Sequence, residues 1–276
     1  MVDPRRYPVS SDALYEPPAH TLEDALAFES SVGLDKIVLV QPSIYATDNT
    51  CLLEALKTIG PSRGYGVVVI DPSNAPLPML KDWDALGVRA VRINLKSVGK
   101  VMTPDQLRDT LIQQANVIRP LGWVIQVFLP LDLVPSLEEI VPQLGVKVCV
   151  DHFGGPDLSS ISWDNSPSSS SSFDPYSLPG FSSLVSLAQR KMVYVKLSAP
   201  YRFSKDNQMR DIRAMALELL HVAPDRVIFA TDWPHTRFEG VNIAPYMESC
   251  LEWCGNDPDL IERLFKRNSE EMFAKV

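Results

Sequence analysis

The feature that most constrains the fold is an alternation of short apolar runs with helix-like segments along almost the whole chain. The run at residues 36–43 is continuous, which is typical of strands buried on both faces of a parallel sheet. The intervening segments carry helix signals, such as Thr103-Pro104, where a capping threonine precedes a proline at the first helical position. The predicted strands are residues 36–43, 65–71, 90–95, 124–129, 146–153, 193–200 and 227–232.

Strands and helices that alternate at this spacing predict an α/β fold of the TIM-barrel type, (β/α)8. A closed barrel needs eight strands, and residues 1–20 are proline-containing and show no hydrophobic period. We therefore expect a distorted barrel whose first strand is missing, built as one domain of residues 1–276. Residues 157–180 break the rhythm with a Ser-rich stretch, which predicts a flexible surface insertion.

Composition narrows the class of function. The formal net charge of −8 and the pI near 5.1 argue against a nucleic-acid-binding protein. No stretch approaches the roughly 18 apolar residues of a membrane span, and the first residues lack the apolar core of a secretory signal. The four cysteines fit neither a redox motif nor a zinc motif, so we expect reduced thiols and a cytoplasmic location. The oligomeric state does not follow from the sequence.

Polar residues gather where the predicted strands end, and in β/α barrels the chemistry sits at those ends. Asp232 ends the last strand, and His152 ends the fifth. Asp232 is a candidate general base on water, while His152 could polarise a carbonyl group or relay a proton. Arg92 and Arg202, with Lys96 nearby, predict a site for a small anion, because arginine pairs bidentately with carboxylates.

Each of these residues also has a structural alternative. Asp232 could pair with a barrel lysine such as Lys196, and His152 could be a satisfied core histidine. The two arginines could belong to structural ion pairs, and Lys96 could be a solvated loop residue.

Six blocks spread over nearly the whole chain resemble one known family. They include Val150-Asp-His-Phe-Gly-Gly-Pro156, Val195-Lys-Leu-Ser-Ala-Pro-Tyr-Arg202 and Ala230-Thr-Asp-Trp-Pro-His235, and the others are residues 3–8, 38–45 and 87–94. Together they resemble the amidohydrolase-related family, in particular its branch of 2-pyrone-4,6-dicarboxylate lactonases. The resemblance implies a distorted (β/α)8 barrel that hydrolyses a cyclic ester or a related bond.

The resemblance also implies roles for single residues. Asp232 would activate water and His152 would lie against the substrate carbonyl. The predicted substrate-binding residues are Ser43, Arg92 and Arg202, which would hold carboxylates, together with Tyr15 and His235.

One departure from the family pattern affects the chemistry. The family begins with a strand carrying an Asp-x-His-x-His motif just before the segment that here is residues 3–8. That strand is expected to be missing, either from the protein or from an incomplete sequence. Without that strand, only His152 and Asp232 would remain as metal ligands, fewer than the three protein ligands of catalytic zinc sites. The resemblance points the same way, because lactonases of this branch are thought to work without a metal. We therefore expect no metal and no other cofactor.

The prediction is a metal-independent hydrolase of a small anionic lactone or ester, such as a pyrone dicarboxylate or an aromatic carboxylate. Two alternatives stay open. One is a catalytically impaired pseudoenzyme that binds anions, because two histidines that would polarise the carbonyl are absent. The other is a decarboxylase-type lyase, which generally needs a metal.

Overall fold

The structure is a computed structural model that describes residues 1–161 and 173–275. Its centre is a curled sheet whose strands run in chain order, and all six neighbouring pairs are parallel. The strands are β1 (Ile37–Val40), β2 (Gly64–Val68), β3 (Val88–Asn94), β4 (Val124–Phe128), β5 (Val148–Val150), β6 (Val193–Leu197) and β7 (Val227–Phe229).

The predicted strands and their parallel arrangement are confirmed. Within the described ranges the sheet has seven strands, and its edge strands β1 and β7 do not pair with each other. The α/β fold is therefore a partly open barrel, with a gap between β1 and β7. The expectation that a histidine-bearing strand is missing stays a prediction.

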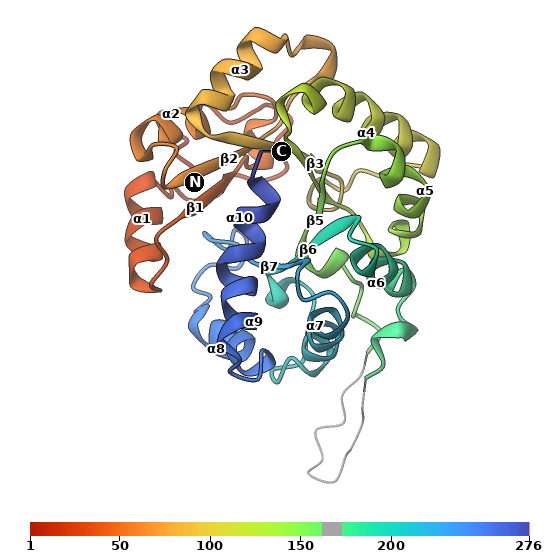
Figure 1. The fold of residues 1–276 in the computed structure, drawn as a ribbon. Coiled ribbons are helices and arrows are strands. Elements are labelled where there is room, and N and C mark those ends of the chain that lie inside the picture. The colour runs from red at the N-terminus through yellow and green to blue at the C-terminus, as the bar shows by residue number, and fades with distance from the viewer. Residues whose placement is uncertain (162–172, 276) are drawn as a thin grey trace.

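Most of the helices form a ring around the outside of the strands, and α10 lies across one end of them (Figure 1). The helices are α1 (Leu22–Ser31), α2 (Thr50–Ile59), α3 (Leu77–Leu86), α4 (Pro104–Ile118), α5 (Pro135–Leu144), α6 (Phe181–Gln189), α7 (Arg210–Val222), α8 (Ala244–Trp253), α9 (Pro258–Glu262) and α10 (Asn268–Phe273). The predicted helix over 257–273 is interrupted by a π-helical turn at Arg263–Arg267.

Local sequence signals explain where several helices begin. The Thr103 side chain accepts a hydrogen bond from the backbone N–H of Gln106, whose own side chain accepts from the Thr103 N–H. Thr21 and Asp24 form the same reciprocal pair at the start of α1. Each capping box satisfies two backbone donors that a helix start leaves without partners.

The core has two layers. The residues of the inner layer show which end of the barrel is covered and which is open. A large cluster fills the space between the sheet and the helices, while a small cluster fills the barrel interior. Met272 and Phe273 of α10 belong to the inner cluster. Lys147, just before β5, donates to the carbonyl oxygens of Glu271 and Met272 at 2.7 and 3.0 Å. Helix α10 therefore covers the amino ends of the strands, which leaves the carboxyl ends for a site.

The predicted Ser-rich insertion at 157–180 lies partly outside the described residues, which omit 162–172. Its described part includes a 3-10 turn at Pro175–Ser177, capped by the Asp174 side chain. Its flexibility and the single-domain organisation stay predictions. No helix in the described ranges is long and apolar enough to cross a membrane.

Candidate active site

A cavity of about 220 Å³ opens at the carboxyl ends of the strands and continues along the gap between β1 and β7. Most of the predicted site residues lie in its wall. They are Tyr15, Ser43, Arg92, His152, Arg202 and Asp232. His235 is not among the lining residues of this cavity.

Asp232 follows β7, and one of its two oxygens is held by two strong donors. The Tyr201 hydroxyl donates to Oδ2 at 2.6 Å, and Arg202 Nε donates to the same oxygen at 2.7 Å. Burial alone would raise the pKa of Asp232, but His152, Arg202 and the Tyr201 hydrogen bond outweigh it and hold this pKa below its usual range. Asp232 is therefore a carboxylate at neutral pH, and its Oδ1 accepts no hydrogen bond from the described residues.

His152 follows β5 and is buried, with Phe128 packed edge-on against its ring at 4.7 Å between centroids. Its Nδ1 lies 2.7 Å from Ser198 Oγ, and its Nε2 lies 3.8 Å from Asp232 Oδ1, too far for a hydrogen bond. Burial lowers the pKa of His152, although the carboxylates of Asp232 and Asp151 oppose the shift. The imidazole is therefore neutral near pH 7. Its Nε2 lies beside Asp232 Oδ1, the oxygen that accepts no hydrogen bond from the described residues.

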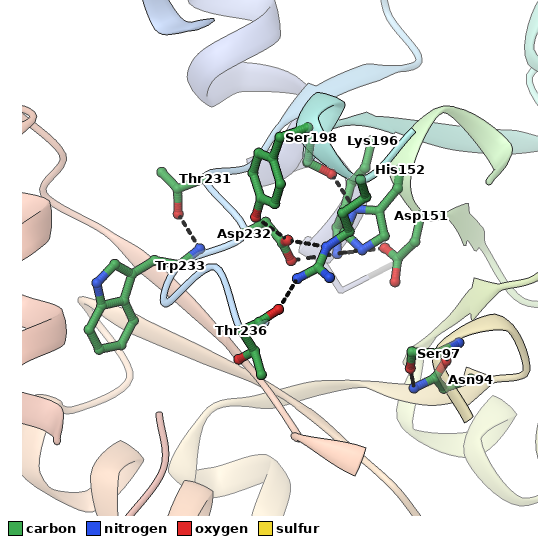
Figure 2. Close-up of polar contacts among 12 residues, drawn as sticks. Asn94, Ser97, Asp151, His152, Lys196, Ser198, Thr231, Asp232, Trp233 and Thr236 are labelled. Carbon is green, nitrogen blue, oxygen red and sulfur yellow. Dashed lines mark hydrogen bonds and ion pairs between the residues drawn. The ribbon is translucent and has the colours of Figure 1, made fainter. Parts of the chain in front are cut away.

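A second buried carboxylate lies beneath this pair. The ammonium of Lys196 lies 2.8 Å from Asp151 Oδ1, and Gln126 Nε2 donates to Asp151 Oδ2 at 2.9 Å. Figure 2 shows Asp151, Lys196, His152 and Asp232 converging from the ends of β5, β6 and β7. Lys196 thus neutralises Asp151 and not Asp232, so the expected structural alternative for Asp232 is not realised through this lysine.

Arg92 of β3 carries a donor that no described residue uses. Its Nη1 donates to the Gln41 carbonyl at 3.0 Å, but its buried Nε has no partner, and it forms no ion pair in the described part of the chain. A buried N–H donor without a hydrogen-bond partner is costly. In the wall of the same cavity, the hydroxyls of Tyr15 and Ser43 lie 3.1 Å apart. These three side chains form an arrangement suited to a carboxylate.

Arg202 and His235 were predicted to contact the substrate; Arg202 lines the cavity and His235 does not, and both make further contacts within the protein. Arg202 is bonded to Asp232, and its Nη2 donates to the Thr236 carbonyl at 3.3 Å. His235 packs edge-on against Phe28 and Tyr201, and its backbone N–H donates to the Asp232 carbonyl at 2.9 Å. Both residues therefore support the loop that carries Asp232.

The donor set does not fit a catalytic divalent metal. No group of three or more His, Cys, Asp or Glu side chains in residues 1–161 and 173–275 is arranged to hold one. Asp232 Oδ2 already accepts from a guanidinium and a hydroxyl, which leaves Oδ1 and His152 Nε2, short of the three protein ligands of a catalytic zinc site.

The backbone around the site adopts conformations that few residues favour. His152, Phe153, Ala199, Asp232 and His235 all have φ between 49° and 59°. They follow the ends of β5, β6 and β7, and each such left-handed residue costs on the order of 1–3 kcal/mol. These turns aim the His152 and Asp232 side chains at the same cavity, and strain of this kind clusters at functional sites.

Two supporting residues had no role assigned from the sequence. Tyr201 directly precedes Arg202, and its bond to Asp232 depends on a loop conformation that the sequence does not show. Ser198 lies two residues after Lys196 along the β6 direction, so the period of a strand places both on the inner face. That period was the only signal for Ser198 as a partner of His152.

Comparison with known proteins decides the family. The amidohydrolase family profile matches residues 2–275. The chain belongs to the amidohydrolase family. The predicted family and the expectation of a hydrolase are thereby confirmed, and the fold agrees with the barrels of related structures.

Three relatives of this amidohydrolase are informative. A 4-sulfomuconolactone hydrolase of Hydrogenophaga intermedia is 29% identical over 98% of this chain and 81% of its own length. A 2-pyrone-4,6-dicarboxylate hydrolase of Comamonas testosteroni is 28% identical over 83% of this chain and 72% of its own length. A crystal structure from Pseudomonas putida, described as a candidate 2-pyrone-4,6-dicarboxylic acid hydrolase, has a TM-score of 0.77 and 28% identity, covering 96% of this chain and 90% of that one.

Proposed function

We propose that this amidohydrolase hydrolyses a small anionic lactone without a metal, with Asp232 activating the water. The observation that carries the proposal is a carboxylate with one committed and one free oxygen, placed beside a neutral imidazole. The free oxygen, Asp232 Oδ1, lies 3.8 Å from His152 Nε2 in the cavity wall. A base and a hydrogen-bond donor at that separation suit a water and a carbonyl group placed side by side.

The tautomer of His152 follows from its neighbours. The negative charge at Asp232 favours a proton on Nε2, so Nδ1 accepts a hydrogen bond from the Ser198 hydroxyl at 2.7 Å. The Nε2–H group then donates to the lactone carbonyl oxygen as negative charge develops on it.

The reaction needs one water and no other reactant. Asp232 Oδ1 accepts a proton from water as the water oxygen bonds to the carbonyl carbon. The ring C–O bond then breaks, and the proton on Asp232 passes to the leaving oxygen. Arg202 and Tyr201 keep Oδ2 fixed throughout, so Oδ1 keeps its direction toward the water.

Arg92, Ser43 and Tyr15 would hold a carboxylate of the substrate at the β1–β3 side of the cavity. The names of the relatives support this class, because both curated names describe hydrolases of lactones that carry acidic groups. In this proposal Arg202 and His235 act mainly through Asp232. A cytoplasmic location belongs to the same proposal, and all four cysteines are free and buried.

The test is hydrolysis of 2-pyrone-4,6-dicarboxylate and 4-sulfomuconolactone, followed by loss of ring absorbance. Asp232→Asn should lower kcat by about 10²- to 10⁴-fold, the range of general-base catalysis. Asp225→Asn is the matched control, because Asp225 pairs with Lys191 at the surface and lies outside the cavity. Equal rates for Asp232→Asn and wild type would remove Asp232 as the base.

Treatment with a chelator separates this proposal from the decarboxylase alternative. We expect the same hydrolysis rate before and after chelation. Activity that disappears with the chelator and returns with zinc or manganese would replace the proposal with metal-dependent chemistry. Tight binding of both lactones without turnover would instead indicate a pseudoenzyme.

A further inference from the structure

The wall of the catalytic cavity contains three buried polar atoms that have no hydrogen-bond partner among the described residues. They are one donor, Arg92 Nε, and two acceptors, the side-chain oxygens of Gln41 and Gln126. The two glutamines are 0% and 1% exposed. Buried polar side-chain atoms normally have a partner, so this group of unused atoms in one cavity indicates a place for a polar ligand group.

The orientation of both side-chain amides is fixed by their other partners. Gln126 Nε2 donates to Asp151 Oδ2 at 2.9 Å. Burial would raise the pKa of Asp151, but Lys196 and its other neighbours lower it, so this carboxylate can only accept. Gln41 Nε2 donates to the Asp48 carbonyl at 2.7 Å, and a backbone carbonyl also only accepts. Each amide therefore keeps its oxygen for another donor.

The two amide oxygens belong to neighbours of Arg92. Arg92 and Gln126 are partners in the register of β3 and β4, and adjacent strands lie about 4.8 Å apart. The Arg92 side chain extends toward β1, where its Nη1 donates to the backbone carbonyl of Gln41 at 3.0 Å. The unused donor of Arg92 is thus accompanied by an acceptor from each neighbour.

A carboxylate alone does not satisfy this arrangement. It accepts from Arg92 Nε, but it carries no proton to give to the amide oxygen of Gln126. A hydroxyl group next to the carboxylate supplies that proton while the carboxylate pairs with the guanidinium. The donor and acceptors around Arg92 therefore match a hydroxy acid better than an acid without a hydroxyl group.

We propose that Gln126 determines substrate specificity, because its amide oxygen accepts a hydrogen bond from a substrate hydroxyl next to the carboxylate that Arg92 binds. Gln41 supplies a second acceptor for a further hydroxyl. This inference rests on the proposed function and narrows its substrate class to lactones of hydroxy acids. A substrate without the hydroxyl leaves a buried acceptor unpaired, and sites built to bind a hydroxyl discriminate strongly against analogues that lack it.

The kinetic test compares γ-butyrolactone γ-carboxylate with its β-hydroxy derivative, in both configurations at the hydroxyl carbon. We expect wild type to prefer one configuration of the hydroxylated lactone by about 10- to 100-fold in kcat/KM, the effect of one buried hydrogen bond. Gln126→Met keeps the length of the side chain but removes the acceptor, and it should abolish most of this preference. A ratio between two substrates cancels a general loss of activity, so a purely structural role of Gln126 would leave the ratio unchanged.

The matched control is Gln114→Met, which should keep the preference. Gln114 of α4 is also buried, its Nε2 donates to the Ile70 carbonyl at 3.2 Å, and its side-chain oxygen has no partner among the described residues. It does not line the catalytic cavity.

Three kinetic outcomes would overturn the proposal. One is a wild type that hydrolyses all three lactones with equal kcat/KM, because water alone would then satisfy the amide oxygen of Gln126. The second is an unchanged preference in Gln126→Met. The third is an equal loss of preference in Gln114→Met.

A binding measurement keeps the inference testable if none of these lactones is hydrolysed. Calorimetric titration of wild type with each enantiomer of malate and with succinate compares dianions of the same carbon skeleton that differ by one hydroxyl group. Tighter binding of one malate enantiomer that is lost in Gln126→Met would support the hydroxyl site even though the proposed function had failed. Equal affinity of wild type for malate and succinate would refute it.

Discussion

The bond between Tyr201 and Asp232 leads to a sharp prediction about pH. The Tyr201 hydroxyl donates to Asp232 Oδ2 at 2.6 Å, and burial raises the pKa of Tyr201, so the hydroxyl keeps its proton throughout the useful range. Tyr201→Phe removes one donor to the carboxylate and leaves Arg202 in place. Because the donor stabilises the charged form, its loss must raise the pKa of Asp232.

The size of the effect follows from the kind of bond. A hydrogen bond to a charged group contributes about 1.5–3 kcal/mol, and one pKa unit corresponds to about 1.4 kcal/mol. A general base works only when deprotonated, so activity is lost as the pH falls through its pKa. The acid limb of the profile should therefore move about one to two pH units upward in Tyr201→Phe.

The assay is kcat/KM for lactone hydrolysis from acidic to mildly alkaline pH, because this parameter reports ionisations of the free enzyme. Tyr176→Phe is the matched control: its hydroxyl donates to Glu218 at 2.6 Å on the exposed surface, far along the chain from Asp232. An acid limb that stays in place in a folded Tyr201→Phe protein would refute the assignment of that limb to Asp232.

Further predictions concern the residues beneath and beside the catalytic pair. Lys196→Met leaves the buried Asp151 without its partner and should lower the free energy of unfolding in urea by about 3–5 kcal/mol. Lys191→Met breaks an exposed ion pair and should lower the same free energy by less than about 1 kcal/mol. Burial tends to raise the pKa of Asp151, but Lys196 and its other neighbours lower it overall, so the stabilisation by this pair is present at neutral pH and is lost on acidification. The difference in the free energy of unfolding between wild type and Lys196→Met should therefore shrink as the pH falls, as urea unfolding followed by circular dichroism would show. Ser198→Ala removes the partner of His152 Nδ1 and should reduce kcat about tenfold with little change in KM, with partial recovery in Ser198→Thr. A kcat for Ser198→Ala equal to that of wild type would contradict the assigned tautomer.

The fold could be predicted because its signals are local. The apolar run that became β1 is continuous, and helix starts carry visible caps, such as Thr103 at α4. The site could be predicted only as a set of strand-end residues. Asp232 and His152 were identified, and the structure places both in one cavity. Their partners were not identified, because pairing across β5, β6 and β7 depends on register and on loop geometry.

Arg202 illustrates the limit. The sequence predicts a substrate-binding arginine or a structural ion pair, and it does not show that the partner is Asp232, thirty residues away along the chain. Lys96 illustrates the opposite case. A lysine just after β3 is predicted to be a solvated loop residue, but the fold brings Gly155, Pro156 and the ring of Phe203 close to its ammonium.

The sequence alone determined the alternation of parallel strands and helices, the end of the sheet where the candidate site residues gather and the residue types available there. These properties depend on hydrophobic period and capping, which act over a few residues. The tertiary structure decided which carboxylate meets which cation: Lys196 pairs with Asp151, Arg202 pairs with Asp232, and Arg92 keeps a free donor. The reason is physical. Buried charges interact over a few ångströms, and left-handed turns at His152 and Asp232 set those distances after the sheet has curled.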